Sequence, residues 1–393
     1  MMDTYIDEDQ NSESKTNTNP QSQGQGTKYD KLQQSSQVVG TKKPTQNQLD
    51  EELEQLLQTQ NAKIRVIGSG GGGNNTIDRI SEVGILGAET VAVNTDAQDL
   101  LYTTADRKIL IGKEVTKGLG AGSNPKMGEE AARESEQEIK KSIEGADMVF
   151  VTCGLGGGTG SGSAGIIAEV AKKLKILTIG IVTMPFAMEG NRRYQNALYG
   201  LERLAENTDT LIVIPNDKLI ELAPDLPMNT AFKIADEILT NAVKGIAELI
   251  TKAGLVNLDF ADIRAVMSDG GVALIGVGES DSDERAVEAV EKAISNPLLS
   301  VDIKDAGGAL INISGSSSLT LEESRRIVEA VTEKIDEDAR VIWGAQIYED
   351  MEQTLRVMLI ITGVNSDQIF GTRNSIKDKR KREIGDELGI EFV

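Results

Sequence analysis

The sequence feature that most constrains this chain is a run of glycines placed between a strand and a helix. Residues 154–162 read Gly-Leu-Gly-Gly-Gly-Thr-Gly-Ser-Gly. The apolar run at 146–152 predicts a buried strand before them, and the small and apolar residues of 164–171 predict a helix after them. Glycine adopts positive φ angles and lets backbone N–H groups approach a ligand, and the helix start adds a partial positive charge. The run therefore predicts a phosphate-binding turn, because a flexible glycine linker is not expected at such a junction.

Two further glycine segments occupy similar positions. Residues 68–76 follow a predicted strand at 63–67 and contain the pattern G-x-G-x-x-G, which alone would weakly suggest a dinucleotide-binding Rossmann unit. Residues 118–125 form the third segment, ahead of a helix expected at about 127–142. Together the segments offer more amide donors than one phosphate needs, so a di- or triphosphate is the natural ligand. The Walker pattern G-x-x-x-x-G-K-[ST] does not occur in the sequence.

Most of the predicted strands lack polar alternation and are separated by helices. Besides the two strands above, they are expected at 90–94, 109–112, 176–182 and 210–214. This order predicts a parallel sheet with helices on both faces, so the fold class is α/β with a Rossmann-like nucleotide-binding domain. Ligands of such sheets collect at the carboxyl ends of the strands, where all three glycine segments are expected to lie.

A second region follows a long helix. Apolar residues recur at helical spacing from about 228 to 252 and predict a central helix that joins two domains. Beyond it, strands and helices alternate again and predict a second, smaller α/β domain. The strands are expected at 272–277, 309–313, 341–347 and 355–361, and the helices at about 283–294 and 320–336.

Five segments are therefore expected along the chain. They are a disordered polar extension (1–46), a nucleotide-binding domain with a short leading helix (47–227), the central helix (228–252), the second domain (253–365) and a flexible tail (366–393). The extension is too polar to offset its chain entropy by burial. The apolar face of the leading helix, made by Leu49, Leu53, Leu56 and Leu57, either packs on the first domain, which we favour, or docks a partner. The apolar end of the tail is either a docking peptide or a frayed terminus.

Composition excludes several classes of function. The chain of 393 residues has 62 acidic and 41 basic residues, a formal charge of -21, so nucleic acid and anionic membranes are poor partners. It lacks an apolar stretch long enough for membrane insertion and a signal-peptide pattern, which predicts a cytoplasmic protein. The single cysteine, Cys153, fits a reducing compartment and is expected to be buried and inert. The absence of histidine excludes Ser-His-Asp catalysis and histidine-based zinc sites, and we expect no protein metal site.

The glycine run also carries a resemblance to a known family. Residues 156–162 resemble the signature loop of the tubulin and FtsZ superfamily, and the further matches below narrow the resemblance to the FtsZ family, of the archaeal kind. It covers about residues 62–365. The resemblance implies a protein that binds and hydrolyses GTP and polymerises head to tail into the filaments of the cell-division ring. It implies GTP or GDP as ligand, Mg²⁺ held mainly through phosphates and water, and a tail that binds a membrane anchor or division regulators.

The resemblance also implies a set of nucleotide contacts. The residues that match are Gly70, Gly71, Gly72, Gly73, Asn74 and Asn75 in the first glycine segment and Gly157, Gly158, Thr159 and Gly160 in the signature loop. Glu189 and Arg193 match the ribose loop, although without the resemblance the pair could also be a surface ion pair. Phe232 and Asp236 match the residues that meet guanine, where one carboxylate accepts from N1 and N2, which adenine cannot donate. Its pattern alone would place Phe232 in the core.

The expected catalytic residues lie in the second region. Asn257, Asp259 and Asp262 resemble the loop that completes the site of the next subunit in a filament, where the carboxylates would polarise the attacking water. Spacing alone favours another interpretation, a helix N-cap followed by an acidic first turn. Ser123 departs from the family pattern, because glycine is more usual at that position, and this weakens the assignment of a phosphate contact to the third glycine segment.

Two other functions are compatible with parts of the pattern. A dinucleotide-dependent oxidoreductase would explain Gly68, Gly70 and Gly73, but it leaves no place for the second glycine turn with Thr159 and lacks an evident general acid. A structural filament that binds nucleotide without hydrolysing it would share the fold and the binding residues. It would differ only in that phosphate release does not rise with protein concentration.

Overall fold

The computed structural model describes residues 62–222, 227–252, 254–256, 258–299, 303–304 and 306–364. The predictions for the polar extension, for the leading helix around residues 49–57 and for the tail at 366–393 lie outside the described residues. Asn257 lies outside them as well.

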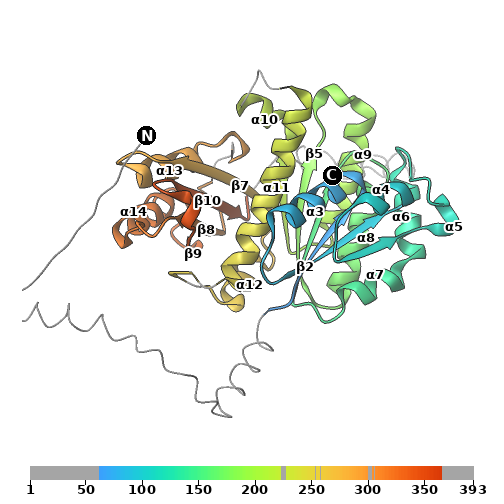
Figure 1. Cartoon of the computed structure of the whole chain (residues 1–393), viewed down its shortest axis with the longest axis horizontal. Coiled ribbons are helices and arrows are strands. Elements are labelled where there is room, and N and C mark those ends of the chain that lie inside the picture. Colours follow the sequence, from blue (N-terminus) through green and yellow to red (C-terminus); the bar gives the residue numbers. More distant parts are fainter. Residues whose placement is uncertain are drawn as a thin grey trace, which may run out of the picture. The chain divides into compact units, whose positions relative to one another are not determined.

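Strands and helices alternate through the first half of the described chain (Figure 1). The elements there are β1 (Ile64–Ser69), α3 (Gly70–Val83), β2 (Ala88–Asn94), α4 (Ala97–Tyr102), β3 (Arg107–Leu110), α5 (Lys113–Thr116), α6 (Pro125–Glu134), α7 (Glu136–Ile143), β4 (Met148–Gly154), α8 (Thr159–Lys173), β5 (Leu177–Met184), η1 (Ala187–Glu189), α9 (Asn191–Ala205), β6 (Thr210–Pro215) and α10 (Asn216–Leu222). This is the alternation that the sequence predicts for an α/β fold.

The second half begins with the long helix. Its elements are α11 (Met228–Thr251), α12 (Phe260–Met267), β7 (Gly271–Ser280), α13 (Arg285–Ile294), η2 (Pro297–Leu299), β8 (Gly308–Gly315), α14 (Leu321–Thr332), β9 (Arg340–Ile347), η3 (Glu349–Met351) and β10 (Leu355–Thr362). All the strands expected from the sequence in this region are present.

The described strands form one sheet in the order β3-β2-β1-β4-β5-β6-β7-β10-β8-β9. From β3 to β6 all neighbours pair in parallel, which confirms the parallel sheet expected from the sequence. β7 pairs in parallel with the start of β6, with Thr210 opposite Gly271, so hydrogen bonding continues from the first half into the second. β10 then pairs antiparallel with both β7 and β8. The boundary between two domains within residues 62–364 stays a prediction.

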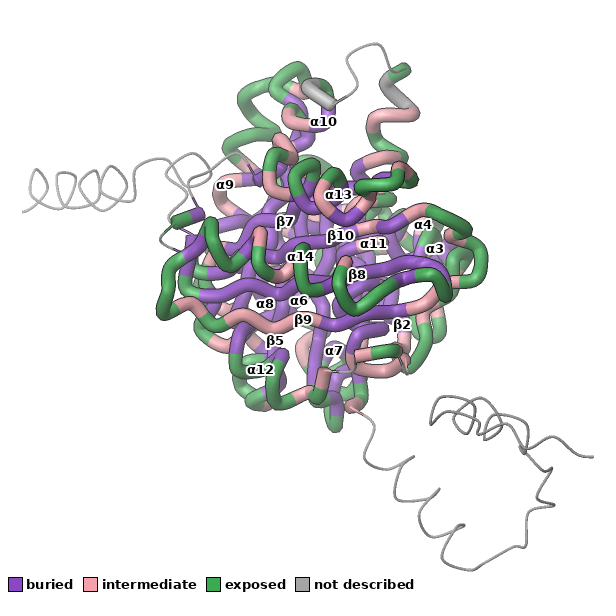
Figure 2. The backbone as a smooth tube through the Cα atoms, turned by 90° about the vertical axis from the view of Figure 1, so that its left-hand side faces the viewer, coloured by how far each residue is buried: buried purple, intermediate pink, exposed green. Residues whose placement is uncertain are grey.

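Helices cover both faces of the parallel part of the sheet, so its central strands β4 and β5 are buried along almost their whole length (Figure 2). One core cluster includes Ile67, Val151 and Ile167, and another on the opposite side of the strands includes Val66 and Phe150, all fully buried. Successive residues of a strand point to opposite faces, which is why neighbours such as Val66 and Ile67 belong to different clusters. Such two-sided burial explains the lack of polar alternation in the strand sequences.

α11 confirms the predicted central helix and packs against both halves of the chain (Figure 1). Its side chains Val243 and Ile246 are fully buried. A Cβ atom added at Gly245 would lie 1.9 Å from Cε of Met358 on β10, so glycine lets this strand approach the helix closely. Among the described residues, no helix is both long and apolar enough to cross a bilayer.

The helix expected at about 127–142 is two helices, α6 and α7, separated at Ser135. The side-chain oxygen of Ser135 accepts a hydrogen bond of 3.1 Å from the backbone N–H of Gly112. This bond ties the junction of the two helices to the start of α5. The helical periodicity of the sequence does not reveal the junction, since its partner lies 23 residues away.

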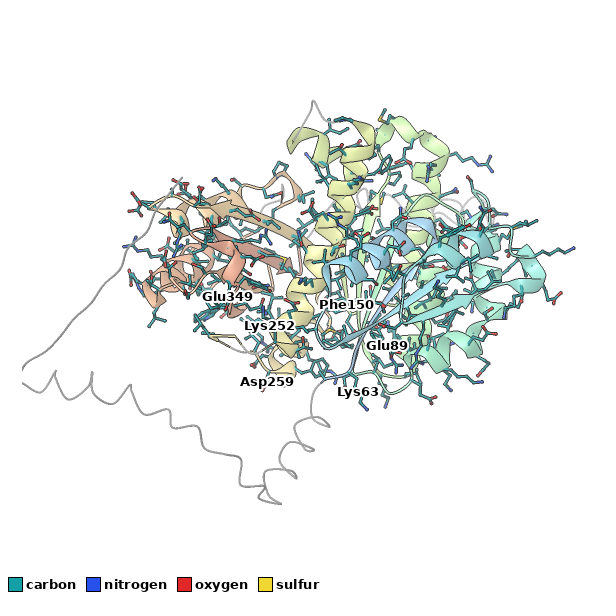
Figure 3. All side chains as sticks on the ribbon, viewed as in Figure 1. Lys63, Glu89, Phe150, Lys252, Asp259 and Glu349 are labelled. Atoms are coloured by element: carbon teal, nitrogen blue, oxygen red, sulfur yellow. The ribbon has the colours of Figure 1, made fainter. Side chains whose placement is uncertain are left out.

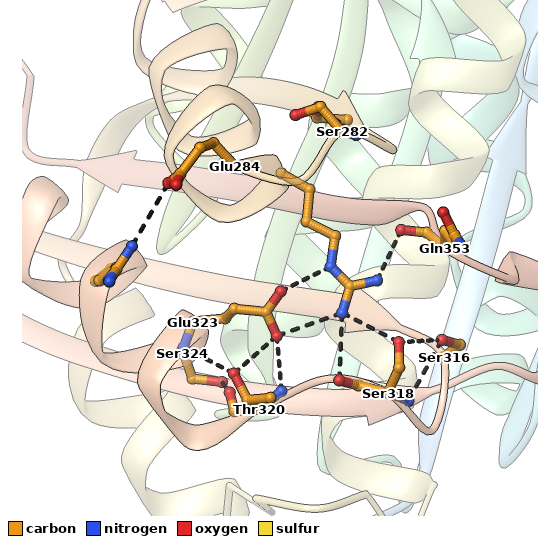
Figure 4. A network of polar contacts seen from close by, with 11 residues as sticks. Ser282, Glu284, Ser316, Ser318, Thr320, Glu323, Ser324 and Gln353 are labelled. Atoms are coloured by element: carbon orange, nitrogen blue, oxygen red, sulfur yellow. Dashed lines mark hydrogen bonds and ion pairs between the residues drawn. The ribbon is translucent and has the colours of Figure 1, made fainter.

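A polar network centred on Arg285 joins four segments of the second half (Figure 4). Its guanidinium donates to both carboxylate oxygens of Glu323, at 2.7 and 3.3 Å, and to the backbone oxygens of Gln353 and Ser318, at 2.7 and 3.3 Å. Glu323 also forms the capping box of α14 with Thr320. Burial would raise the pKa of Glu323, but the bonds from Arg285 and Thr320 outweigh it and lower that pKa.

Candidate functional site

The first glycine segment is the first turn of α3 itself, where the sequence predicts a loop. Gly70 starts the helix with a φ of 69°, which favours glycine. A Cβ atom added at Gly73 would lie 2.7 Å from the backbone oxygen of Thr152, and one at Gly72 would lie 3.0 Å from the backbone nitrogen of Gly154. The glycines therefore let the start of α3 pack directly against the end of β4.

The signature loop is also shorter than its sequence suggests. Residues 155–158 form the turn after β4, and α8 begins at Thr159. The backbone N–H of Gly158 donates to the oxygen of Gly122 at 3.0 Å, and a Cβ atom added at Gly158 would lie 2.3 Å from that oxygen. A Cβ atom at Gly70 would lie 2.8 Å from the nitrogen of Gly160. The three glycine segments thus meet at the carboxyl ends of β1 and β4.

The helix starts at this meeting point suit an anion. Neither α3 nor α8 has a side-chain cap or an acidic residue in its first turn. Their first backbone N–H groups therefore have no capping carboxylate, and each helix dipole places a partial positive charge there. Gly157 adds open space, since a Cβ atom there would meet nothing within 4 Å. Backbone donors around open space form a cradle for phosphate oxygens.

Polar side chains from β2 and α4 line the same end of the sheet. The hydroxyls of Thr95 and Thr159 lie 2.6 Å apart. A carboxylate oxygen of Asp99 accepts from Asn94 at 2.6 Å and from Asn74 at 3.4 Å. The amide oxygen Oδ1 of Asn74 is buried and has no hydrogen-bond partner. Because a buried acceptor without a partner is costly, this oxygen is suited to a donor from a ligand or water.

Three polar residues at this end of the sheet, Thr95, Asp99 and Asn216, are not among those that the sequence motifs predict. Asn216 follows β6 directly, is 4% exposed and has a buried Oδ1 without a partner. The sequence feature that could have revealed Asn216 is a polar residue directly after an apolar strand. Asn75, by contrast, is exposed, because consecutive helical residues face different directions.

Phe232 and Asp236 lie one turn apart on α11. The expectation from pattern alone that Phe232 is a core residue is wrong, since it is 38% exposed. Its ring meets that of Phe186 edge-on, with centroids 5.2 Å apart. Burial raises the pKa of Asp236 to about 6, although the positive charge of Arg79 acts to lower it. An exposed ring beside a half-buried carboxylate is an arrangement that can stack on a base and accept its N–H groups.

Glu189 and Arg193 form an ion pair of 2.9 Å between Oε2 and Nη1. The other carboxylate oxygen of Glu189 accepts from the backbone N–H of Phe186 at 2.9 Å and caps η1. The ion pair is the alternative that the sequence left open. Both carboxylate oxygens of Glu189 still have lone pairs that could accept from a ribose hydroxyl. The ion pair is therefore compatible with the ribose contact, which stays a prediction.

Asp259 is the N-cap of α12. Its Oδ1 accepts from the backbone N–H groups of Ala261 and Asp262, at 2.6 and 3.1 Å, which is the capping role that spacing alone favours. Asp262 follows in the first turn and is exposed. A catalytic role for these two carboxylates stays a prediction.

The acidic pair lies at the opposite end of the sheet from the glycine segments. α12 leads into β7, whose first residue pairs with Thr210 at the amino end of β6, and Thr210 also donates to the oxygen of Met267. The glycine segments lie at the carboxyl ends of β1 and β4. The length of α11 also separates the acidic residues from the expected base-binding residue. Phe232 lies near the start of α11, and the acidic residues follow its end. At 1.5 Å per residue, Phe232 and Thr251 are about 28 Å apart along the helix.

Other reactive groups in the described residues offer no second centre. Cys153 is fully buried, and burial raises the pKa of its thiol to about 12, which makes it an inert core residue as expected. No group of three or more acidic, cysteine or histidine side chains within 62–364, as far as the structure describes it, could hold a metal ion.

Comparison with known proteins agrees with this geometry. Residues 63–224 match the GTPase domain of the Tubulin/FtsZ family, and residues 271–365 match the C-terminal domain of the FtsZ family. "Cell division protein FtsZ 1" of Thermococcus kodakarensis is 63% identical over 82% of this chain and 86% of its own length. "Cell division protein FtsZ" of Methanothermobacter thermautotrophicus is 55% identical over 88% of this chain and 93% of its own length. A solved structure described as an empty FtsZ dimer of M. jannaschii is 60% identical, covers 81% of this chain and 92% of its own, and has a TM-score of 0.78.

Proposed function

The chain belongs to the tubulin/FtsZ family and within it to the FtsZ proteins, and from that membership we propose how its residues share the binding and hydrolysis of GTP. It is a GTPase of the cell-division type.

The glycine segments hold the phosphates. The backbone donors at the starts of α3 and α8, from Gly70–Gly73 and from Gly157–Gly160, surround the phosphate oxygens, and the hydroxyl of Thr159 adds a donor. Support comes from the close contact of these segments and from their uncapped helix starts. The unpaired oxygen of Asn74 accepts from the ligand or from its bound water, and Asn75 lies at the rim.

The start of α11 selects guanine. Phe232 stacks on the base, and the ionised carboxylate of Asp236 accepts from guanine N1 and N2. Asn216 offers a further buried acceptor at the same end of the sheet. Glu189 accepts from the ribose hydroxyls, and its ion pair with Arg193 holds the carboxylate in place.

Hydrolysis takes place only where two copies of the chain meet. The observation that carries this step is the placement of the acidic residues at the amino ends of the strands, opposite the phosphate site. Within one copy they are too far from the phosphates to orient a water. Head-to-tail stacking brings Asp262, with Asn257 and Asp259, to the phosphates of the next copy, where the carboxylates polarise the attacking water. Assembly therefore activates the enzyme.

The remaining parts of the proposal concern partners. When Mg²⁺ is bound, phosphate oxygens and water supply most of its ligands, as suits an ion that keeps much of its hydration shell. The filaments act at the division site, and the description of the relatives as cell division proteins supports this step. The tail beyond residue 365 binds a membrane anchor or division regulators.

Turnover measured against protein concentration tests the central step. GTP hydrolysis per subunit should rise steeply above a threshold concentration, together with light scattering. Asp262→Ala should lower turnover at least about 100-fold while leaving GTP binding and filament formation in place. Asp283→Ala is the matched control, because Asp283 is also an exposed acidic residue of the second half but precedes α13. Full turnover by subunits that are prevented from stacking would contradict the proposal.

A further inference from the structure

Four side chains connect the end of α11 with the end of β9, and we call them the β9 clasp: Glu248, Lys252, Gln346 and Tyr348. The hydroxyl of Tyr348 lies 2.6 Å from Oε2 of Glu248 and 2.9 Å from Oε1 of Gln346. The ammonium group of Lys252 lies 3.6 Å from the centre of the Tyr348 ring. The clasp thus holds the last turn of the central helix by one hydrogen bond to a carboxylate and one cation–π contact.

The hydrogen bond from Tyr348 carries most of this connection. Glu248 is 3% exposed, and a buried carboxylate is costly unless a donor satisfies it. The charged group nearest to it, the Lys244 ammonium, is 3.8 Å away, beyond hydrogen-bond distance. Tyr348 is therefore the donor within hydrogen-bond distance, and burial together with the Glu248 bond raises the pKa of its hydroxyl, which keeps the proton on the donor.

The clasp continues directly into the acidic loop. Lys252 is the C-cap of α11. The backbone N–H of Leu255 donates to the oxygen of Ala345 on β9 at 2.9 Å, and Val256 forms an antiparallel bridge with the same residue. Asp259 caps α12 three residues after that bridge. In Figure 3, Lys252 and Asp259 lie at the same end of α11. β9 therefore holds both the helix end and the loop that carries the acidic residues.

A cavity of about 240 Å³ lies beside the clasp, between α11 and the sheet. Tyr348 and Lys244 line it together with Asn312 and Met358. Because one side of Tyr348 faces this space, packing alone does not hold its ring in place. Once the hydrogen bond to Glu248 is lost, the cation–π contact of Lys252 and the backbone pairing of residues 255–256 with Ala345 still hold the end of α11 on β9, but with one side-chain bond fewer.

We propose that Tyr348 is a positioning residue for GTP hydrolysis, which fixes the end of α11 on β9 and so aims the carboxylates of the acidic loop at the next subunit. This inference rests on the proposed function, because it matters only if those carboxylates act on the neighbour's nucleotide. Tyr348 itself touches neither nucleotide nor water. Its effect reaches the reaction through the backbone of residues 252–259.

Tyr348→Phe tests the inference, because it removes the donor and keeps the ring for Lys252. We expect turnover per assembled subunit to fall about tenfold, as a misplacement of 1 Å or less can cause. GTP affinity of the unassembled subunit and the KM for GTP should stay within about twofold, since the nucleotide site lies at the other end of α11. Tyr199→Phe is the matched control. The Tyr199 hydroxyl also donates to a carboxylate, that of Glu129 at 2.7 Å, and its ring also contacts a cation, Arg203.

A double variant separates positioning from simple loss of stability. Tyr348→Phe combined with Glu248→Gln removes, along with the donor, the buried charge that has lost its hydrogen bond and keeps only Lys244 at 3.8 Å, so thermal stability should recover toward that of the parent protein. Turnover should stay low, because the bond that sets the position is still missing. Recovery of turnover in parallel with stability would show a merely structural role and overturn the inference.

Two further variants distinguish failure of the positioning role from failure of the proposed function. Lys252→Met removes the cation–π contact from a half-buried position, where folding is not at risk, and should lower turnover about threefold with the KM unchanged. Asp262→Ala separates this inference from the proposed function. If Asp262→Ala loses turnover while Tyr348→Phe and Lys252→Met keep it, the positioning role is wrong and the shared active site stands. If Asp262→Ala keeps full turnover, the proposed function fails and the inference fails with it.

Discussion

Acidification should weaken guanine nucleotide binding through one residue, Asp236. Burial raises the pKa of its carboxyl from 3.8 to about 6, and the nearby Arg79 does not fully offset this. Only the ionised carboxylate accepts hydrogen bonds from both guanine N1 and N2, because a protonated carboxyl carries a donor on one oxygen. GTP affinity should therefore rise as the pH rises through the pKa of Asp236, about 6, and should be weak at lower pH.

The magnitude follows from the fraction of the group that is ionised. With a pKa of about 6, roughly 97% of Asp236 is ionised at about pH 7.5 and roughly 9% at about pH 5. The apparent affinity should thus fall about tenfold between these values. Asp236→Asn should bind GTP weakly with little pH dependence over the same range, because the amide cannot ionise.

The same substitution should affect stability in the opposite sense. A carboxyl whose pKa is higher in the folded state than in the unfolded state destabilises the fold as pH rises through about 4 to 6. Removing that charge should therefore stabilise the nucleotide-free protein above about pH 6. A shift of about two pH units corresponds to about 3 kcal/mol, and we expect about 1–2 kcal/mol because solvent screens the exposed part of the side chain.

Equilibrium binding of a fluorescent guanine nucleotide, at fixed ionic strength and below the assembly threshold, measures the first effect. Thermal unfolding of the nucleotide-free protein measures the second. Equal binding by the parent protein at both ends of the pH range would contradict the role of Asp236 in guanine binding. Parent-like affinity of Asp236→Asn at neutral pH would contradict it as well.

Three other predictions follow from single contacts. Gly158→Ala should lower the free energy of unfolding by about 1–3 kcal/mol and weaken GTP binding, because its Cβ would lie 2.3 Å from the oxygen of Gly122. Gly157→Ala should leave the Tm nearly unchanged, since its Cβ would meet nothing within 4 Å, and an equal loss of stability in both variants would contradict the packing argument. Arg285→Ala should cost about 3 kcal/mol in denaturant unfolding, because Glu323 then keeps only its bonds from Thr320 and the backbone oxygens of Gln353 and Ser318 lose a charged donor. It should leave GTP affinity of the unassembled subunit unchanged, and a wild-type midpoint would show that the network of Figure 4 adds little. Cys153 should react with an aromatic disulfide reagent at about pH 8 only when the protein unfolds, and rapid labelling of the native protein would contradict its burial and raised pKa.

Local patterns in the sequence determined the elements of this protein. Apolar runs of strand length, helical periodicity and glycine segments at strand ends are properties of neighbouring residues, so they predicted the parallel sheet, the central helix and the end of the sheet where the glycine segments lie. Even the capping role of Asp259 is local, because the cap bonds residues only two and three positions away. The same locality explains the errors, since periodicity alone placed Phe232 in the core and joined α6 to α7.

Contacts between distant residues required the tertiary structure. The unpaired oxygens of Asn74 and Asn216 are meaningful only because other segments bury them, and the bond between Tyr348 and Glu248 joins residues 100 positions apart. Strand order also came from the structure, because the pairing of β6 with β7 depends on side chains that no local pattern relates. That pairing places the acidic residues at the end of the sheet opposite the glycine segments. Such hydrogen bonds and strand pairings depend on which surfaces meet in the folded protein. No local stretch of sequence specifies those surfaces.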